Sequence, residues 1–115
     1  MIKKYFIENN PYPKSGFVSP FIDTAFNGCL FMWDSSFILM FTKYANRVFP
    51  FQKTLDNFYS LMHKDGFICR EINEKSGWDK FTKNDPSSTG PNILAWCEWQ
   101  YYENFKDLDR LRKVY

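Results

Sequence analysis

Apolar side chains recur at the spacing of a helix in successive segments of this chain, and residues that start or stop helices border each segment. The first helix is predicted over residues 34–46, with Asp34 as its N-cap. Its apolar stripe consists of Phe37, Ile38, Phe41, Tyr44 and Ala45. A second helix is predicted from Pro50 to about residue 64, because proline suits a first turn and Asp65-Gly66 ends a helix. Its stripe consists of Leu55, Phe58, Tyr59 and Met62.

The C-terminal part of the chain carries the same kind of pattern. A third helix is predicted over residues 91–104, with Thr89 or Gly90 as its cap and Pro91 in its first turn. Its stripe consists of Leu94, Cys97, Tyr101 and Phe105. The pair Lys106-Asp107 breaks this helix before a last amphipathic stretch. Each predicted helix is apolar on one face, so the first hairpin must pack against further helices.

Two segments lack helical periodicity. Residues 1–33 form an extended lead-in, because prolines and glycine recur there too densely for a helix. Residues 65–90 form a long irregular loop, with a short extended piece at 67–72, and a loop of that length in a compact domain is usually functional or disordered. The predicted fold is therefore all-α, with a lead-in at 1–33, a helical hairpin at 34–64, a cleft loop at 65–90 and a second helical pair at 91–115.

Composition narrows the partners of the chain. Its 115 residues are of one-domain size, and 15 basic against 13 acidic side chains give a net charge of +2 without a dominant basic patch. Nothing in this charge favours nucleic acid or a membrane surface, and neither a signal peptide nor a membrane-spanning run is visible, so we expect a cytoplasmic protein. Aromatic residues make up 21% of the chain, which favours a stacking surface or a missing neighbour.

The cysteines do not form a recognisable site. Cys29, Cys69 and Cys97 are odd in number and widely spaced, which argues against a disulfide framework and against a zinc site. They are best interpreted as buried thiols. The sequence also lacks a glycine-rich phosphate loop and a metal-ligand cluster, so we expect no metal and no cofactor.

Two residue pairs are candidates for ligand binding. In Trp33-Asp34 the indole could stack on a sugar ring while the carboxylate accepts hydrogen bonds from its hydroxyls. The alternative is a buried Trp followed by a capping Asp. Arg70-Glu71 could clamp a hydroxyl or a carboxylate, and its alternative is an exposed ion pair.

Further candidates lie in the loop and in the third helix. Residues 76–79 read Ser-Gly-Trp-Asp, in which Asp79 beside an indole could act as a general acid, or could simply be solvated. On the third helix, Trp96 and Trp99 point about a quarter of a turn apart, so we expect one in a cleft and the other in the core. His63 is interpreted as a surface residue near a helix end.

Three motifs in order resemble a known family. They are Trp-Asp-Ser-Ser-Phe at residues 33–37, Asp-Gly-Phe-Ile-Cys-Arg-Glu-Ile at 65–72 and Ser-Thr-Gly-Pro-Asn-Ile-Leu-Ala-Trp at 88–96. Together they resemble the opening third of the six-hairpin glycosidases, the group around mannosylglycerate hydrolase and processing glucosidase I and, more distantly, trehalase. The resemblance covers about residues 16–115, and the order and spacing of the motifs make it specific.

The resemblance implies a fold and a chemistry. The fold would be part of an (α/α)6 toroid, in which twelve helices form two rings around a sugar-binding funnel. The enzymes invert the anomeric configuration with one carboxylic acid and one carboxylate. By this resemblance Trp33 and Asp34 bind the substrate, Arg70 and Glu71 belong to a cleft loop, and Trp96 is a further substrate contact.

The chain also departs from the family pattern. The family acid lies in a Ser-Gly-x-Asp motif after the Leu-Ala-Trp helix and one further helix, whereas Asp79 precedes that helix. Four helices cannot close a twelve-helix ring, so we expect a fragment, a truncated reading frame or a subunit completed by another chain. The first hypothesis is a glycoside hydrolase segment for a glucoside or mannoside, inactive alone. The second is a non-catalytic helical domain that binds sugar or protein through Trp33, Trp78 and Trp96, and the third is an inactive gene remnant.

Overall fold

The computed structural model describes residues 19–22 and 28–115, so most of the predicted lead-in lies outside the described residues. The described chain is mostly helical, as expected, and adds one small sheet. Its α-helices and strands are β1 (Cys29–Phe31), α2 (Met32–Thr42), α3 (Thr54–Ser60), β2 (Glu71–Asn73), α4 (Leu94–Phe105) and α5 (Leu108–Val114), and short 3-10 helices lie at Lys43–Ala45, Phe51–Lys53 and Pro86–Ser88. No helix in this described part combines the length and the apolar character needed to cross a membrane.

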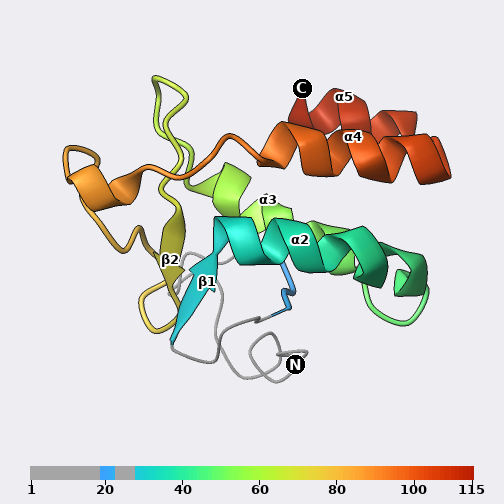
Figure 1. Ribbon diagram of the computed structural model, residues 1–115, viewed down its shortest axis with the longest axis horizontal. Coiled ribbons are helices and arrows are strands. Elements are labelled where there is room, and N and C mark those ends of the chain that lie inside the picture. Colours follow the sequence, from blue (N-terminus) through green and yellow to red (C-terminus); the bar gives the residue numbers. More distant parts are fainter. Residues whose placement is uncertain (1–18, 23–27) are drawn as a thin grey trace.

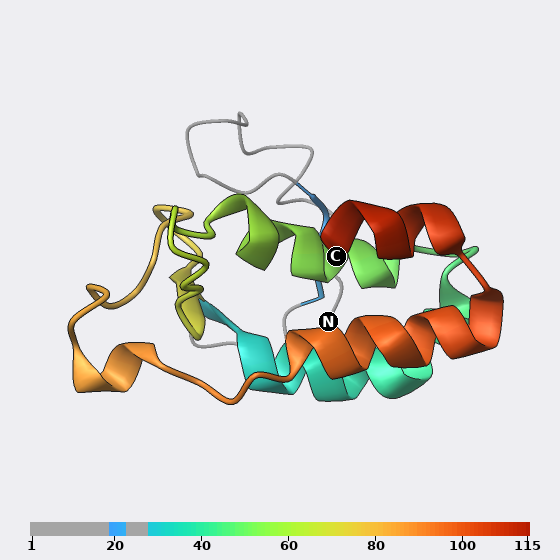
Figure 2. The same ribbon diagram turned by 90° about the horizontal axis from the view of Figure 1, so that it is seen from above.

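The helices form two antiparallel hairpins that lie against each other (Figure 1). Viewed from above, α2 and α4 lie side by side in one layer, and α3 and α5 form the other layer (Figure 2). Both α2 and α4 begin at the same end of the molecule, which is the end that carries the sheet and the irregular segment. The start of each hairpin is therefore presented at one end of the helical layers.

An apolar core lies between the hairpins and the sheet. Its fully buried side chains come from β1, α2, α3, β2 and α4, and include Leu30, Leu39, Leu55, Phe58, Ile72 and Cys97. All three cysteines are buried, and none of them is in a disulfide bond. The predicted stripe of α4 is largely confirmed, since Leu94, Cys97 and Tyr101 are buried and only Phe105 is exposed.

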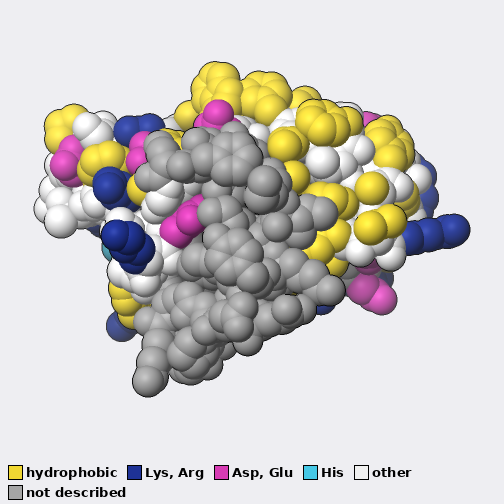
Figure 3. All heavy atoms as spheres, turned by 90° about the horizontal axis from the view of Figure 1, so that it is seen from below, with side chains coloured by type: hydrophobic (Ala, Val, Ile, Leu, Met, Phe, Trp, Pro, Cys, Tyr) yellow, Lys and Arg dark blue, Asp and Glu magenta, His cyan; other side chains and the backbone are white. Residues whose placement is uncertain are grey.

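The predicted buried face of α2 is wrong. Its aromatic side chains are exposed, and the face that packs inward carries Met32, Ser35, Ser36 and Leu39. Ser36 can be buried because its hydroxyl donates a hydrogen bond to the Met32 carbonyl oxygen at 2.8 Å. The exposed set is Trp33, Phe37, Phe41 and Tyr44, at the spacing of one helix face. We call it the α2 aromatic row. In Figure 3, hydrophobic side chains of the molecule gather along its upper edge and right-hand side.

Several predicted helix ends are shifted. Helix α2 begins at Met32, so Asp34 lies in its first turn and is not its N-cap, which is Phe31. Helix α3 ends at Ser60, before the Asp65-Gly66 turn predicted to end it. Gly66 itself adopts the left-handed conformation (φ 87°). Helix α4 starts at Leu94, so neither Thr89 nor Gly90 caps it.

The sheet adds a long-range pairing to the predicted all-α fold. Strand β1 pairs with β2 in antiparallel register, with Leu30 opposite Ile72 and Phe31 opposite Glu71. Both central side chains are buried, and this gives the pairing its apolar contact. The extended piece predicted at residues 67–72 thus contributes a strand at 71–73, and the lead-in ends in its partner.

The predicted break between the last two helices is confirmed. Lys106 adopts the left-handed conformation (φ 54°) at the end of α4. Asp107 then caps α5, because its carboxylate accepts a hydrogen bond from the Arg110 backbone N–H at 2.9 Å. The reversal folds α5 back towards α3 (Figure 2).

Candidate functional site

Three segments that are distant in sequence meet at the end where α2 and α4 begin. The backbone N–H of Met32 donates a hydrogen bond to the Arg70 carbonyl oxygen at 2.9 Å. The backbone N–H of Arg70 in turn donates to the Ser88 carbonyl oxygen at 3.0 Å. These bonds connect the start of α2, the start of β2 and the turn that leads into α4. We call this region, comprising residues 32–34, 70–73 and 86–96, the loop end.

Trp33 and Asp34 are both exposed at the loop end. Trp33 is 50% exposed, so the alternative of a buried Trp is wrong. Its ring contacts Phe37 one helical turn later, with ring centroids 5.4 Å apart. Asp34 lies in the first turn of α2, where the helix dipole favours a negative charge. An indole face and a carboxylate are therefore both open to solvent at one helix start.

Trp96 extends the aromatic surface from α2 to α4. Its ring lies 6.0 Å from the ring of Phe37, which links it to Trp33. Trp96 is 42% exposed and Trp99 48% exposed, so the expectation that one of them packs in the core is wrong. Trp99 contacts Tyr102 on a different side of α4.

Arg70 and Glu71 form a close ion pair at the loop end. Arg70 Nη1 lies 2.6 Å from Glu71 Oε1. Glu71 is only 7% exposed, so this is not the freely exposed pair of the alternative interpretation. Arg70 Nε also donates a hydrogen bond to the Ser87 carbonyl oxygen at 2.5 Å, and its Cζ lies 5.1 Å from the centre of the Phe81 ring. The guanidinium is thus held in one orientation while its side chain stays 37% exposed.

Asp79 belongs to a hairpin beside the loop end. Its Oδ2 lies 2.7 Å from His63 Nε2, and its backbone pairs with Ile72. Asp79 Oδ1 is buried and has no hydrogen-bond partner among the described residues. These contacts tie the hairpin to the segment after α3. His63 is therefore a partner of Asp79, which sequence reasoning missed because the two residues are joined only by the fold.

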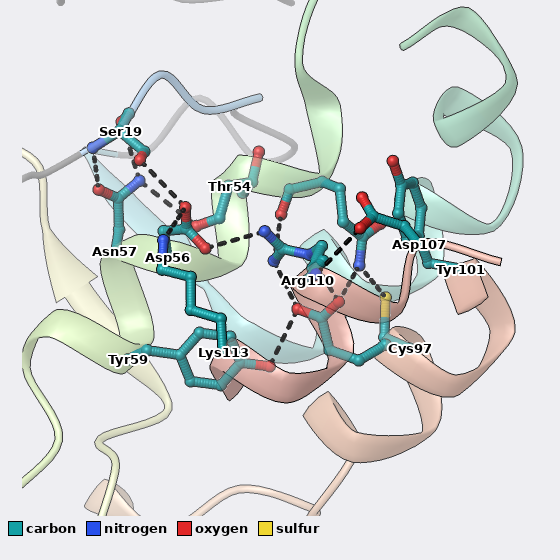
Figure 4. A network of polar contacts seen from close by, with 12 residues as sticks. Ser19, Thr54, Asp56, Asn57, Tyr59, Cys97, Tyr101, Asp107, Arg110 and Lys113 are labelled. Atoms are coloured by element: carbon teal, nitrogen blue, oxygen red, sulfur yellow. Dashed lines mark hydrogen bonds and ion pairs between the residues drawn. The ribbon is translucent and has the colours of Figure 1, made fainter. Parts of the chain in front are cut away.

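A second cluster of charges lies between α3, α4 and α5. Figure 4 shows the Arg110 guanidinium between carboxylates of the other two helices. Arg110 Nη2 lies 2.5 Å from Glu98 Oε1, its Nε donates to Glu98 Oε2 at 2.8 Å, and its Nη1 lies 3.1 Å from Asp56 Oδ1. Gln52 and Tyr59 also donate hydrogen bonds to Glu98, at 2.9 and 3.2 Å. We call this cluster the Arg110 network.

The carboxylates of the Arg110 network are buried, and both pair with Arg110. Glu98 is 3% exposed, and Asp56 is also buried. Burial lowers the pKa of the Arg110 guanidinium, but its hydrogen bonds and ion pairs with Glu98 and Asp56 outweigh burial and raise it. Burial, followed by the Glu98 charge, raises the pKa of Tyr59. Helical spacing could have indicated Glu98, because it lies four residues after buried Leu94 on the apolar face of α4.

A pocket of about 630 Å³ adjoins this network on the side of α5. Its lining mixes apolar and polar groups, including Asp56, Tyr59, Leu94, Glu98, Trp99 and Leu111. Asn92, Leu94 and Ala95 of the loop end also line it, whereas Trp33, Asp34, Arg70 and Trp96 do not. Among the described residues no group of His, Cys, Asp and Glu side chains is arranged to hold a metal ion.

Comparison of the chain with protein-family models, with curated proteins and with solved structures gives no match. The loop end and the Arg110 network are therefore the features of the molecule from which its function can be inferred.

Proposed function

We propose that the chain is a segment of an inverting glycoside hydrolase of the (α/α)6 toroid type, and that its loop end holds a sugar ring of a glucoside or mannoside. The observation that carries this proposal is the hydrogen-bonded junction of Met32, Arg70 and Ser88. It joins the three sequence motifs that resemble the six-hairpin glycosidases. Motifs that serve one ligand must meet in space, and these motifs meet where α2 and α4 begin.

The side chains at this junction suit the chemistry of a sugar. Trp33 and Trp96 offer exposed indole faces, which can stack on the apolar face of a pyranose. Asp34 supplies an exposed carboxylate as acceptor, and Arg70 supplies donors from a guanidinium fixed by Glu71. Hydroxyl groups need both acceptors and donors, so this set is better suited to a neutral polyol than to a purely apolar ligand.

The arrangement of the helices supports the toroid. In a toroid the helices of one ring run in the same direction, and each hairpin places one helix in each ring. The pairing of α2 with α4 in one layer and of α3 with α5 in the other follows this plan (Figure 2). Phe41 and Tyr44, which lie in the α2 aromatic row away from the loop end, are then the surface on which further helices, from the same or another chain, would pack.

The catalytic acid and base are proposed to lie outside this segment. Residues 76–79 match the Ser-Gly-x-Asp motif that contains the acid in the family. However, His63 contacts Asp79 Oδ2, and Asp79 precedes the helix that the motif should follow. We therefore propose sugar binding without turnover by this chain alone. Turnover of an aryl glycoside that Asp79→Asn abolishes would overturn this assignment.

A second candidate function is a small non-catalytic domain that binds sugar or protein. The closed core favours it, since Leu39, Leu55 and Phe58 are fully buried without any further helix. This second function would use the exposed Trp33 and Trp96, as the first does, and also Trp78, which is 60% exposed on the hairpin after β2.

Calorimetric titration of the 115-residue chain with methyl glucosides and methyl mannosides, together with hydrolysis assays on aryl glycosides, tests the proposal. We expect weak binding of at least one of these sugars, no turnover, and self-association through Phe41 and Tyr44 of the α2 aromatic row. Binding by a stable monomer would favour the second function. The absence of any sugar binding would contradict the first function and the sugar-binding form of the second.

A further inference from the structure

Gly90 lies against Arg70 so closely that a side chain at this position would collide with it. A Cβ atom built on Gly90 would be 2.9 Å from the Cβ of Arg70, closer than real Cβ atoms approach. Gly90 is not among the glycines with positive φ, which are Gly28, Gly66 and Gly77. Space, and not backbone conformation, is therefore the physical reason for a glycine at position 90.

The turn before Gly90 is also shaped to hold Arg70. Asp85 fixes this turn, because its carboxylate accepts a hydrogen bond from the Ser87 backbone N–H at 2.7 Å. The carbonyl oxygens of Ser87 and Ser88 then accept hydrogen bonds from Arg70 Nε and from the Arg70 backbone N–H. The Phe81 ring lies over the guanidinium. The turn and Phe81 thus form a cradle for one side chain.

The cradle leaves part of the guanidinium for a ligand. Within the described residues, the polar contacts of Arg70 side-chain atoms involve Nε, with Ser87, and Nη1, with Glu71. Nη2 is the guanidinium nitrogen for which none of these contacts is recorded, so both of its N–H groups can donate to a ligand. Because the buried Glu71 carboxylate balances the positive charge, this donor suits an uncharged hydroxyl oxygen better than a carboxylate.

We propose that Gly90 is a positioning residue that sets the orientation of Arg70, so that Nη2 donates to a hydroxyl of an uncharged sugar. This inference rests on the proposed sugar-binding function of the loop end. Gly90 acts only through Arg70. A methyl group at position 90 would displace the Arg70 side chain from Ser87 and turn Nη2 away from the ligand.

The test compares Gly90→Ala with Gly66→Ala. The control glycine has φ 87° and no neighbouring atom within 4 Å, so its alanine variant strains the backbone without touching Arg70. Sugar affinity is measured by NMR titration with methyl mannoside and methyl glucoside. The Arg70 Nε–H resonance, which is protected by its hydrogen bond to Ser87, gives a readout that needs no sugar.

We expect Gly90→Ala to shift the Arg70 Nε–H resonance, to speed its exchange with water and to weaken sugar binding about tenfold, the loss of about one hydrogen bond to a charged group. Gly66→Ala should lower thermal stability while leaving this resonance and the sugar affinity unchanged. In an Arg70→Lys background, which has no Nη2, Gly90→Ala should cause no further loss of affinity.

Equal sugar affinity of Gly90→Ala and the wild type would overturn the positioning role, as would a full loss in the Arg70→Lys background. If the wild type binds no glycoside, the proposed function fails, and this inference fails with it. An unchanged Arg70 Nε–H resonance in Gly90→Ala would overturn the inference alone, whatever the sugar does.

Discussion

Arg70 at the loop end and Arg110 in the Arg110 network each pair with acidic side chains, but they differ in how much of the guanidinium is used. Arg110 directs its donors at Glu98, Asp56 and the Gln52 carbonyl oxygen, and its side chain is 10% exposed. Arg70 pairs with one acid and one carbonyl oxygen, and its side chain is 37% exposed. A buried arginine whose three side-chain nitrogens all have partners joins helices, whereas a fixed arginine with a nitrogen to spare can bind a ligand.

The same difference extends to the surroundings of the two arginines. The Arg110 network lies between helices, where few water molecules can replace a lost partner. At the loop end, the indoles of Trp33 and Trp96 and the carboxylate of Asp34 are exposed to solvent. Changes in the network should therefore affect stability, and changes at the loop end should affect binding.

The largest effect is expected from Arg110→Met. It would leave Glu98 and Asp56 buried without their main cation, so the free energy of unfolding should fall by about 3–5 kcal/mol. Urea denaturation measures this change. Arg112→Met is the control, because its side chain is 72% exposed and its ion pair with Asp109 is weak, so it should change stability by less than about 0.5 kcal/mol. A similarly small effect of Arg110→Met would contradict the structural role of the network.

A smaller effect, on binding instead of stability, is expected from Arg70→Lys. The lysine keeps a positive charge beside Glu71 but loses the planar fork, so sugar binding should weaken by about 1.5–3 kcal/mol. Calorimetry measures the affinity, and urea denaturation should show a change below about 1 kcal/mol. An Arg70→Lys protein that binds sugar normally but has a much lower free energy of unfolding would contradict the proposal that Arg70 serves binding and Arg110 serves stability.

The dryness of the Arg110 network can be tested by pH. Burial raises the pKa of the Cys97 thiol from 9.0 to about 12, with a further contribution from the charge of Glu98. Cys97 therefore contributes stability that is present below pH 9 and is lost as the pH rises from about 9 to about 12. At pH 10 the free energy of unfolding should fall by about 1 kcal/mol more in the wild type than in Cys97→Ser. Equal pH dependence of the two proteins would mean that water reaches the thiol.

The smallest effect concerns ligand charge at the loop end. Glu71→Gln would remove the charge that balances Arg70 and leave a net cation. The preference for a methyl glucuronide over the matching methyl glucoside should rise by about 0.5–1 kcal/mol. Parallel titrations of the wild type and the variant measure it. An unchanged preference would mean that Glu71 does not tune the ligand charge.

Much of the local structure follows from the sequence, and the errors have physical causes. The break at Lys106-Asp107 was predictable because it depends on neighbouring residues. The buried face of α2 was not, because aromatic spacing identifies a face without telling which face packs inward. Buried Ser36 satisfies its hydroxyl within the helix, and buried Lys43 donates to the Gln100 carbonyl oxygen at 3.3 Å, so polar residues could occupy the packed side.

For the candidate site, too, some features could be predicted from the sequence and others could not. The sequence motifs indicated Trp33, Asp34, Arg70, Glu71 and Trp96, and the β1–β2 pairing and the contact between Phe37 and Trp96 connect them. The hydrogen bond from Arg70 to Ser87 and the pairing of His63 with Asp79 could not be predicted, because the partners are 17 and 16 residues apart. A single sequence carries no local signal for such contacts.

The most direct test of the sugar-binding loop end uses the four tryptophans as separate probes. Each indole N–H gives its own NMR signal, and single Trp→Phe variants assign them. On titration with methyl mannoside or methyl glucoside, the signals of Trp33 and Trp96 should shift, while those of Trp78 and Trp99 should not. Shifts confined to Trp99 would move the ligand to the pocket beside α5, and shifts at Trp78 alone, or at none of the four, would contradict a sugar site at the loop end.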